Sequence, residues 1–186
     1  PIGIKISAGH IERDLEYCVF AEPDFITIDG RGGATVPVRF SERGDYRSDD
    51  LCAAPGEKYL DSVRSDISLV ITGGLRVSAD FAKAIAMGAD AVAVASAAMI
   101  AAACQQYRIC GSGNCPVGIA TQDPELRSRM NIEASAQRVA NYLNVSLNEL
   151  RMFARITGHE NIHDLSPDDL ITISREISEF TDIRHA

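Results

Sequence analysis

Four short apolar segments, each followed by a polar or glycine-rich turn, constrain the fold of this chain more than any other feature. They cover residues 2–7, 25–29, 68–72 and 91–95. Their residues are continuously apolar rather than alternating, which is typical of parallel strands with helices on the outside. Helical segments are predicted between them, at 10–20, 57–63 and 79–87, and the stretch 36–54 is polar and irregular. The order β-α-β-α-β-α-β therefore predicts an α/β fold with a parallel sheet.

A barrel and a doubly wound sheet both fit this order, and in either fold ligands bind at the carboxyl ends of the strands. Gly73 and Gly74 follow the third predicted strand and would expose backbone amides to a phosphate. Ala95, Ser96 and Ala97 follow the fourth and begin a helix whose N-terminus adds a positive dipole. Together they predict a phosphate site. The alternative is a glycine turn needed only for tight packing.

Two weaker candidates lie on the first half of the chain. Lys5 is the one cation in an apolar strand and is costly to bury unless it meets an anion. It could face the electron-rich edge of a flavin or a substrate carboxylate, or simply reach solvent. Gly32 and Gly33 belong to a loop that offers backbone donors beside the guanidinium of Arg31.

Three of the five cysteines give the strongest chemical signal. Cys104, Cys110 and Cys115 lie within one short segment, followed by Pro116. Thiolates select iron–sulfur clusters or zinc, and intervening glycines let the backbone wrap close to a cluster. Three ligands fit a cubane that lacks one iron, a [3Fe–4S] cluster, whereas a zinc site usually has four. Three unrelated buried thiols remain the alternative. Cys18 and Cys52 have no spaced partner and are interpreted as plain thiols.

The charge and hydropathy of the sequence restrict the kinds of partner that we expect the chain to bind. The formal net charge of −8 argues against nucleic-acid binding. The longest apolar run, 89–103, contains Asp90 and many alanines and is too short to span a bilayer. We therefore expect no nucleic acid, no membrane and a cytoplasmic location.

Beyond Cys115 the pattern predicts helices only, at 133–143, 147–156 and 167–180. Ser146 with Glu149 is typical of a capping box, and Ser166 with Pro167 is typical of a helix start. His159 and His163 are interpreted as surface or cap residues rather than ligands. Because the chain opens directly in a strand, we interpret it as part of a longer polypeptide or one piece of a split one.

Three segments resemble the flavin domain of glutamate synthase large subunits, in the short archaeal-type form. They are the Thr-Gly-Gly-Leu-Arg turn at 72–76, the Gly-Ala-Asp-Ala-Val-Ala run at 88–93, and the cysteine segment continuing through Pro-Val-Gly-Ile-Ala-Thr-Gln to 122. The similarity runs nearly end to end. The glycine turn is shared with other phosphate-binding barrels such as IMP dehydrogenase, but the cysteine segment is much more specific.

The resemblance implies the C-terminal half of a (β/α)8 TIM barrel over 1–103, an iron–sulfur loop over 104–122 and a helical extension over 123–186. The N-terminal half of the barrel would come from elsewhere. It also implies FMN, with its phosphate on Gly73, Gly74 and the turn of Ala95, Ser96 and Ala97, and with Gly32 and Gly33 on a cofactor-facing loop. Lys5 would approach the flavin or the substrate, and Cys104, Cys110 and Cys115 would hold the [3Fe–4S] cluster.

The implied activity is the reductive amination of 2-oxoglutarate to L-glutamate through 2-iminoglutarate and reduced FMN. The implied partners are a glutaminase domain or subunit that supplies ammonia and an electron donor, either ferredoxin or an NAD(P)H-oxidising FAD subunit. Two departures from the family pattern occur, at Ala34-Thr35 and at Gly111 after the second cysteine. A related subunit such as N-methylglutamate synthase, an FMN/iron–sulfur electron-transfer module without amination, and an inactive half-barrel stay open as alternatives.

Overall fold

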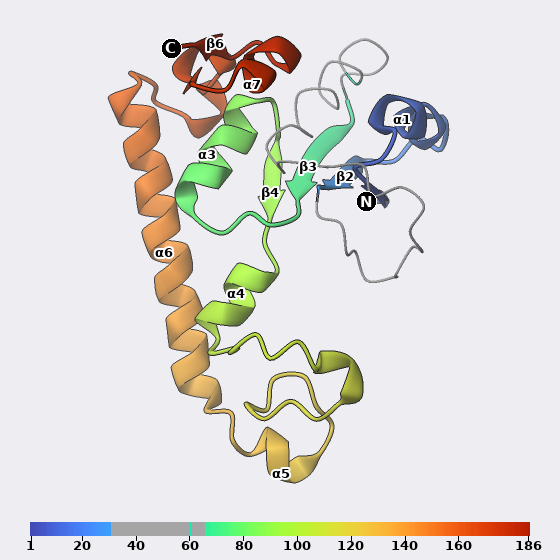
Figure 1. Ribbon diagram of the computed structural model, residues 1–186, viewed down its shortest axis with the longest axis vertical. Coiled ribbons are helices and arrows are strands. Elements are labelled where there is room, and N and C mark those ends of the chain that lie inside the picture. Colours follow the sequence, from blue (N-terminus) through green and yellow to red (C-terminus); the bar gives the residue numbers. More distant parts are fainter. Residues whose placement is uncertain (31–59, 61–65) are drawn as a thin grey trace. The chain divides into compact units, whose positions relative to one another are not determined.

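The computed structural model describes residues 1–30, 60 and 66–186 (Figure 1). These form two compact units, Pro1–Val94 with Leu150–Ala186, and Ala95–Glu149. Gly32, Gly33 and Cys52 lie outside the described residues, as do the polar stretch 36–54 and, apart from Leu60, the predicted helix 57–63.

The first unit contains a four-stranded sheet made of β1 (Gly3–Ser7), β2 (Phe25–Asp29), β3 (Ser68–Thr72) and β4 (Ala91–Ala93). All neighbouring strands are parallel and the order is β1-β2-β3-β4. A doubly wound sheet reverses its strand order at a switch point, and this sheet does not. The predicted α/β class and parallel sheet are confirmed, and the sequential order is consistent with part of a (β/α)8 barrel.

One face of this sheet forms the core of the first unit. Ile26, Ile28 and Ile71 are fully buried, as is Leu15 on helix α1 (Ile11–Phe20). Helix α3 (Ser78–Ala86) adds the buried Phe81. Exposure alternates along β1, where Gly3, Lys5 and Ser7 are exposed and the isoleucines between them are half-buried. The strands thus have one buried and one more open side among the described residues, although their sequence is not alternating.

Gly88 confirms the predicted end of α3, because its φ of 99° is the left-handed conformation of a residue just beyond a helix. The predicted start is one residue late, since α3 includes Ser78 and its N-cap is Val77. The Asp80 carboxylate accepts the backbone N–H groups of Arg76 at 3.0 Å and Val77 at 3.2 Å. An acidic side chain inside the helix therefore satisfies the amides of the N-cap residue and of the residue before it.

The predicted break between two helices near Ser146 is wrong. A single 25-residue helix, α6, runs over Ile132–Ile156. Ser146 lies inside it and is 7% exposed. Nothing between Leu143 and Leu147 is a glycine or proline, so the helix meets no breaker there. Burial of Ser146 within the helix prevails over its tendency to cap one.

The predicted helix over 167–180 is also wrong in part. Ser166 and Pro167 begin only a short 3₁₀ turn, η4 (Pro167–Asp169). The β-branched residues that follow form β5 (Ile171–Thr172), which pairs in parallel with β6 (Arg184–His185). A new helix, α7 (Arg175–Phe180), starts at Ser174, whose hydroxyl accepts the N–H of Ile177 at 3.4 Å. The C-terminal part is therefore not all helical.

The second unit holds α4 (Ser96–Ala101), the 3₁₀ turn η2 (Cys110–Ser112), α5 (Pro124–Arg127) and the first part of α6. The Ser135 hydroxyl on α6 donates to the carbonyl of Ala102, just after α4, at 3.0 Å. This hydrogen bond connects α6 to the end of α4, and the cysteine segment lies between these two helices in the sequence. In the part of the chain that is described, no helix is long and apolar enough to cross a bilayer.

Candidate cofactor sites

Polar side chains gather at the carboxyl end of the sheet in the first unit. The register places Ser7 beside Asp29, and Asp29 beside Thr72. Asp29 and Thr72 are each 8% exposed, so both are buried polar groups. The Thr72 hydroxyl donates to the carbonyl of Ala93 on the next strand at 2.8 Å. This is the edge at which parallel α/β folds bind their ligands.

Lys5 reaches this edge and finds a partner that the sequence analysis did not single out. Its Nζ lies 2.7 Å from Oδ2 of Asp29, and the two side chains are 55% and 11% exposed. The carboxylate therefore holds the lysine while leaving much of it open to solvent. An ammonium has three N–H donors, so the pair still allows a bond to an anionic ligand. The sequence contained a signal for Asp29, because an acidic residue at the end of an apolar strand is a candidate for a site at the carboxyl edge of the sheet.

The glycine turn after β3 has the backbone that only glycine adopts readily. Gly73 has a φ of 108° and Gly74 a φ of 82°. The structure places both directly after Thr72, at the same carboxyl edge. Ala95, Ser96 and Ala97 lie at the start of α4 and belong to the second unit. The joint phosphate site of these two segments stays a prediction.

The three cysteines lie in the second unit in different surroundings. Cys115 is buried, Cys104 is intermediate and Cys110 is exposed. Backbone N–H groups lower the pKa of the Cys115 thiol below its usual value, that of Ala120 most, joined by Val117, Ile119 and Gly118 and opposed by burial. The backbone segment 117–120 therefore acts on the sulfur as a local source of positive partial charge. This arrangement favours a thiolate at Cys115.

Close backbone packing shapes the rest of the cysteine segment. Gly118 has a φ of 81°, and a Cβ there would lie 2.6 Å from the carbonyl oxygen of Leu126. The Cys104 sulfur accepts the backbone N–H of Gln106 at 3.4 Å. Gly113, with a φ of 72°, is the C-cap of η2, which begins at Cys110. Left-handed glycines therefore lie near two of the cysteines, and Gly113 is one of those that intervene between the cysteines.

The fit to a metal cluster is mixed. Thiolate chemistry and sulfur-directed amides suit an iron–sulfur cluster, in which such hydrogen bonds tune the potential. The described residues nevertheless contain no group of three or more His, Cys, Asp or Glu side chains arranged to hold a metal ion. The donor set thus fits by its chemistry, and the ligation itself stays a prediction. Cys18 is buried on α1, where burial and then Asp14 raise the pKa of its thiol.

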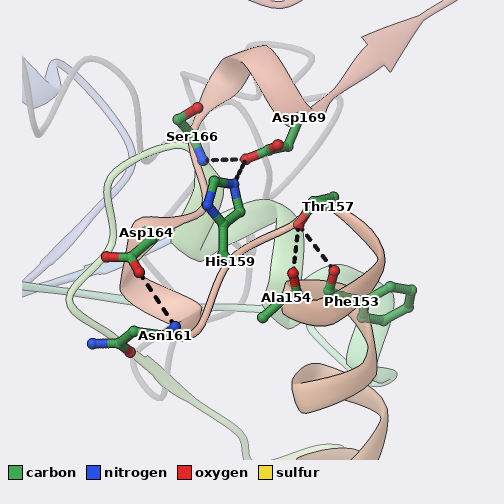
Figure 2. Close-up of polar contacts among 8 residues, drawn as sticks. All are labelled: Phe153, Ala154, Thr157, His159, Asn161, Asp164, Ser166 and Asp169. Atoms are coloured by element: carbon green, nitrogen blue, oxygen red, sulfur yellow. Dashed lines mark hydrogen bonds and ion pairs between the residues drawn. The ribbon is translucent and has the colours of Figure 1, made fainter.

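A polar network at the C-terminal end of α6 was missed by the sequence analysis (Figure 2). Nε2 of His159 lies 2.9 Å from Oδ2 of Asp169, which also accepts the backbone N–H of Ser166 at 2.9 Å. The Ser166 N–H and then His159 lower the pKa of Asp169. Asn161 and Asp164 form a second reciprocal cap at η3 (Ile162–Asp164), which packs on α3. The spacing of Ser166 and Asp169 could have revealed the cap, but not the histidine.

Comparison with known proteins identifies the family. The model of the conserved region in glutamate synthase matches residues 1–160. The chain belongs to the glutamate synthase family.

Individual relatives agree with this assignment. The chain is 32% identical to a glutamate synthase large subunit-like protein of Rhizobium meliloti, over 98% of this chain and 46% of that protein. It is 39% identical to an archaeal-type glutamate synthase (NADPH) of Thermotoga sp. (strain RQ2), over 81% of this chain and 31% of that protein. An archaeal glutamate synthase (NADPH) of Methanocaldococcus jannaschii is 36% identical over 89% of this chain and 33% of its own length. The chain therefore spans less than half the length of these curated relatives.

Proposed function

We propose that this chain is part of a flavin-dependent glutamate synthase that converts 2-oxoglutarate and ammonia to L-glutamate by way of 2-iminoglutarate. The observation that carries the proposal is the family match over residues 1–160, which includes the glycine turn, Lys5 and all three clustered cysteines. When bound, FMN supplies hydride transfer and a [3Fe–4S] cluster supplies single electrons. The residues of this chain would bind these groups, orient the substrate and offset its charge.

The Lys5–Asp29 pair would bind the anionic part of the site. Because Asp29 is nearly buried and holds Nζ at 2.7 Å, the ammonium is positioned before a ligand arrives. Its remaining donors could bind the electron-rich edge of a flavin or a carboxylate of 2-oxoglutarate. Fixing that carboxylate would orient the imine carbon for reduction, since correct orientation supplies much of the rate in such reactions.

The turn of Gly73 and Gly74 would hold the FMN phosphate with backbone amides. Left-handed glycines allow the backbone to approach a phosphate closely. We propose that Ala95, Ser96 and Ala97 add the start of α4 to the same site, and that Gly32 and Gly33 line the flavin from their loop. Cys104, Cys110 and Cys115 would ligate the cluster, with Cys115 as the thiolate stabilised by amides.

Completion of the site would need further segments. In the described part of the chain, β1 and β4 are the edges of a four-stranded sheet. A closed barrel has no edges, so we propose that the remaining N-terminal half of the barrel pairs with them. A glutaminase domain or subunit would supply ammonia, and a ferredoxin or an NAD(P)H-oxidising FAD subunit would supply electrons.

The test is a measurement on the native protein that contains this chain. Flavin is quantified from its absorption spectrum, and iron and acid-labile sulfide are assayed per chain. L-glutamate is then measured with 2-oxoglutarate, ammonia and reduced methyl viologen as an artificial electron donor. We expect one FMN, three irons and glutamate formation that requires both substrates. A protein without flavin, or with one zinc in place of iron, would contradict the proposal.

The same assay separates the related activities. Methylamine in place of ammonia should give little product if the enzyme makes glutamate, and N-methylglutamate if it belongs to the related type. Reduction of the protein without any amino-acid product from either amine would identify an electron-transfer module.

A further inference from the structure

We infer that a pocket at the C-terminal end of α6 binds a small amino dicarboxylic acid, the chemical class of L-glutamate. The pocket has a volume of about 440 Å³, which is enough for a small molecule. It is called here the 151–162 pocket and is lined by Arg151, Ala154, Arg155, His159, Glu160 and Ile162. All of these residues belong to the first unit. The choice of L-glutamate within the class rests on the proposed function, because it is the product of that reaction.

The backbone at the end of α6 shapes this pocket. Gly158 has a φ of 88°, and its N–H donates to the carbonyl of Arg155 at 3.2 Å. The N–H of His159 donates to the carbonyl of Ala154 at 2.8 Å. These two bonds form a Schellman motif, in which a left-handed glycine ends the helix and turns the chain. Because of this turn, Glu160 lines the same pocket as residues of the helix.

The loop that follows the helix is held by side chains before any ligand binds. Nε2 of His159 lies 2.9 Å from Oδ2 of Asp169, and the two side chains are 28% and 16% exposed (Figure 2). The backbone N–H of Asn161 donates to the Asp164 carboxylate at 3.2 Å. A pocket whose walls are already ordered loses less conformational entropy when a ligand enters. The wall at His159 is therefore preorganised.

The charges of the pocket identify the class of ligand. Arg151 and Arg155 lie one helical turn apart, so they share one side of α6. Each guanidinium has five N–H donors, so Arg151 can bind a carboxylate in addition to its interaction within the chain. Glu160 is an anion beyond the C-terminal end of the helix, where the helix dipole also favours a cation. Two guanidinium groups and one carboxylate complement a ligand with two carboxylates and one ammonium group.

Other small anions match the pocket less well. Inorganic phosphate, or a dicarboxylate without an amino group, would leave Glu160 with no opposite charge on the ligand. Ala154 and Ile162 add apolar surface, which suits the methylene groups between the two carboxylates of glutamate. None of the lining residues belongs to the proposed reaction site, so a product molecule bound here need not compete with 2-oxoglutarate.

The experiment measures binding in the absence of turnover. The oxidised native protein that contains this chain is titrated with L-glutamate by isothermal titration calorimetry, without an electron donor and with saturating 2-oxoglutarate to occupy the reaction site. Glutarate, which lacks the ammonium group, and 4-aminobutanoate, which lacks one carboxylate, are titrated in the same way. The variants are Arg155→Gln and Glu160→Gln. Arg138→Gln is the matched control, because Arg138 is an exposed arginine on the same helix but not a lining residue.

We expect one L-glutamate to bind per chain. Arg155→Gln should raise its Kd about tenfold, the usual effect of losing a hydrogen bond between charged groups. Arg138→Gln should change the Kd less than twofold. Glu160→Gln should raise the Kd of L-glutamate about fivefold but should not weaken the binding of glutarate, since only L-glutamate has the ammonium group. Glutarate and 4-aminobutanoate should each bind the parent at least fivefold more weakly than L-glutamate does.

Three results would overturn the inference. They are no binding of L-glutamate in the presence of 2-oxoglutarate, equal weakening by Arg155→Gln and Arg138→Gln, and glutarate binding as tightly as L-glutamate. Thermal unfolding followed by circular dichroism checks that each variant is folded. Flavin content and glutamate formation report on the proposed function separately, so a pocket that binds L-glutamate in a protein that does not make it would be recognised.

Discussion

The carboxyl end of the sheet and the cysteine segment are built on different principles. Lys5, Asp29 and Thr72 lie on three neighbouring strands, and strand register brings them together although they are far apart in sequence. The pKa of Cys115 is instead lowered by backbone amides of residues 117–120, which follow it closely in sequence. The first arrangement is fixed by the fold, whereas the second is fixed by local turns. We therefore expect the flavin side to survive loss of the cluster, while the cluster side responds to single local changes.

The largest effect should come from Cys115→Ser. A serine hydroxyl is a hard, weak ligand for iron, and its oxygen would sit among amides that favour a thiolate. Iron content should fall to near zero, and flavin reduction by the protein donor should stop. Flavin content and the far-ultraviolet circular dichroism spectrum should stay close to those of the parent, because the sheet does not depend on this segment.

Cys18→Ser is the matched control for that substitution. Cys18 is buried on α1 with a raised thiol pKa, far in sequence from the cysteine segment. It should retain full iron content. If Cys18→Ser loses iron, or Cys115→Ser keeps it, the separation between the two regions is wrong.

Gly74→Val should have the next largest effect and should act on the other region. A valine in left-handed backbone is strained by roughly 1–2 kcal/mol, and its side chain would occupy the space proposed for the phosphate. The purified variant should have lost its yellow colour while retaining iron. Gly111→Ala provides the control, since a Cβ at Gly111 has no atom within 4 Å. A variant as yellow as the parent would remove the glycine turn from the flavin site.

The parts that the sequence predicted well are those with short-range signals. The strands over Phe25–Asp29 and Ser68–Thr72 were predicted at their observed bounds, because apolar β-branched runs end there in Gly or Asp. The glycine that ends α3 was predicted for the same reason. The predicted helix break at Ser146 was wrong, because a local capping pattern cannot reveal that the helix continues and that Ser146 is buried within it.

The candidate sites show the same limit. Lys5 was found as an unusual cation, but its partner Asp29 depends on the pairing of β1 with β2, which no local pattern states. The effect of the amides on Cys115 depends on the backbone path of residues 117–120. The spacing of the three cysteines predicted their chemistry but could not give the positions of their sulfur atoms.

A smaller effect should come from Lys5→Gln, which removes the charge, keeps a hydrogen-bond donor and shortens the side chain by one atom. A charge-assisted hydrogen bond contributes about 2 kcal/mol, so the KM for 2-oxoglutarate should rise roughly 30-fold. Asp29→Asn should raise it less, because the lysine keeps its charge and loses only its positioning. Steady-state kinetics with reduced methyl viologen measures both. An unchanged KM in Lys5→Gln would mean that the lysine serves only its partner Asp29.

The smallest effect should come from Asp169→Asn. Asp169 lies in the first unit but, like Cys115, it is held mainly by contacts within a short stretch of sequence. The pKa of Asp169 is lowered in the folded protein by the Ser166 N–H and by His159. A lowered folded pKa means that its stabilisation is complete above the ordinary aspartate range and is lost as the pH falls through the folded value. The variant should be destabilised by about 1 kcal/mol at neutral pH, the usual contribution of a cap, and by less in acid.

Urea unfolding at several pH values measures this difference. His159→Gln, which retains a donor to Asp169, should lose less stability at neutral pH. If the free energies of unfolding of parent and Asp169→Asn differ equally at every pH, the carboxylate contributes by shape and not by charge.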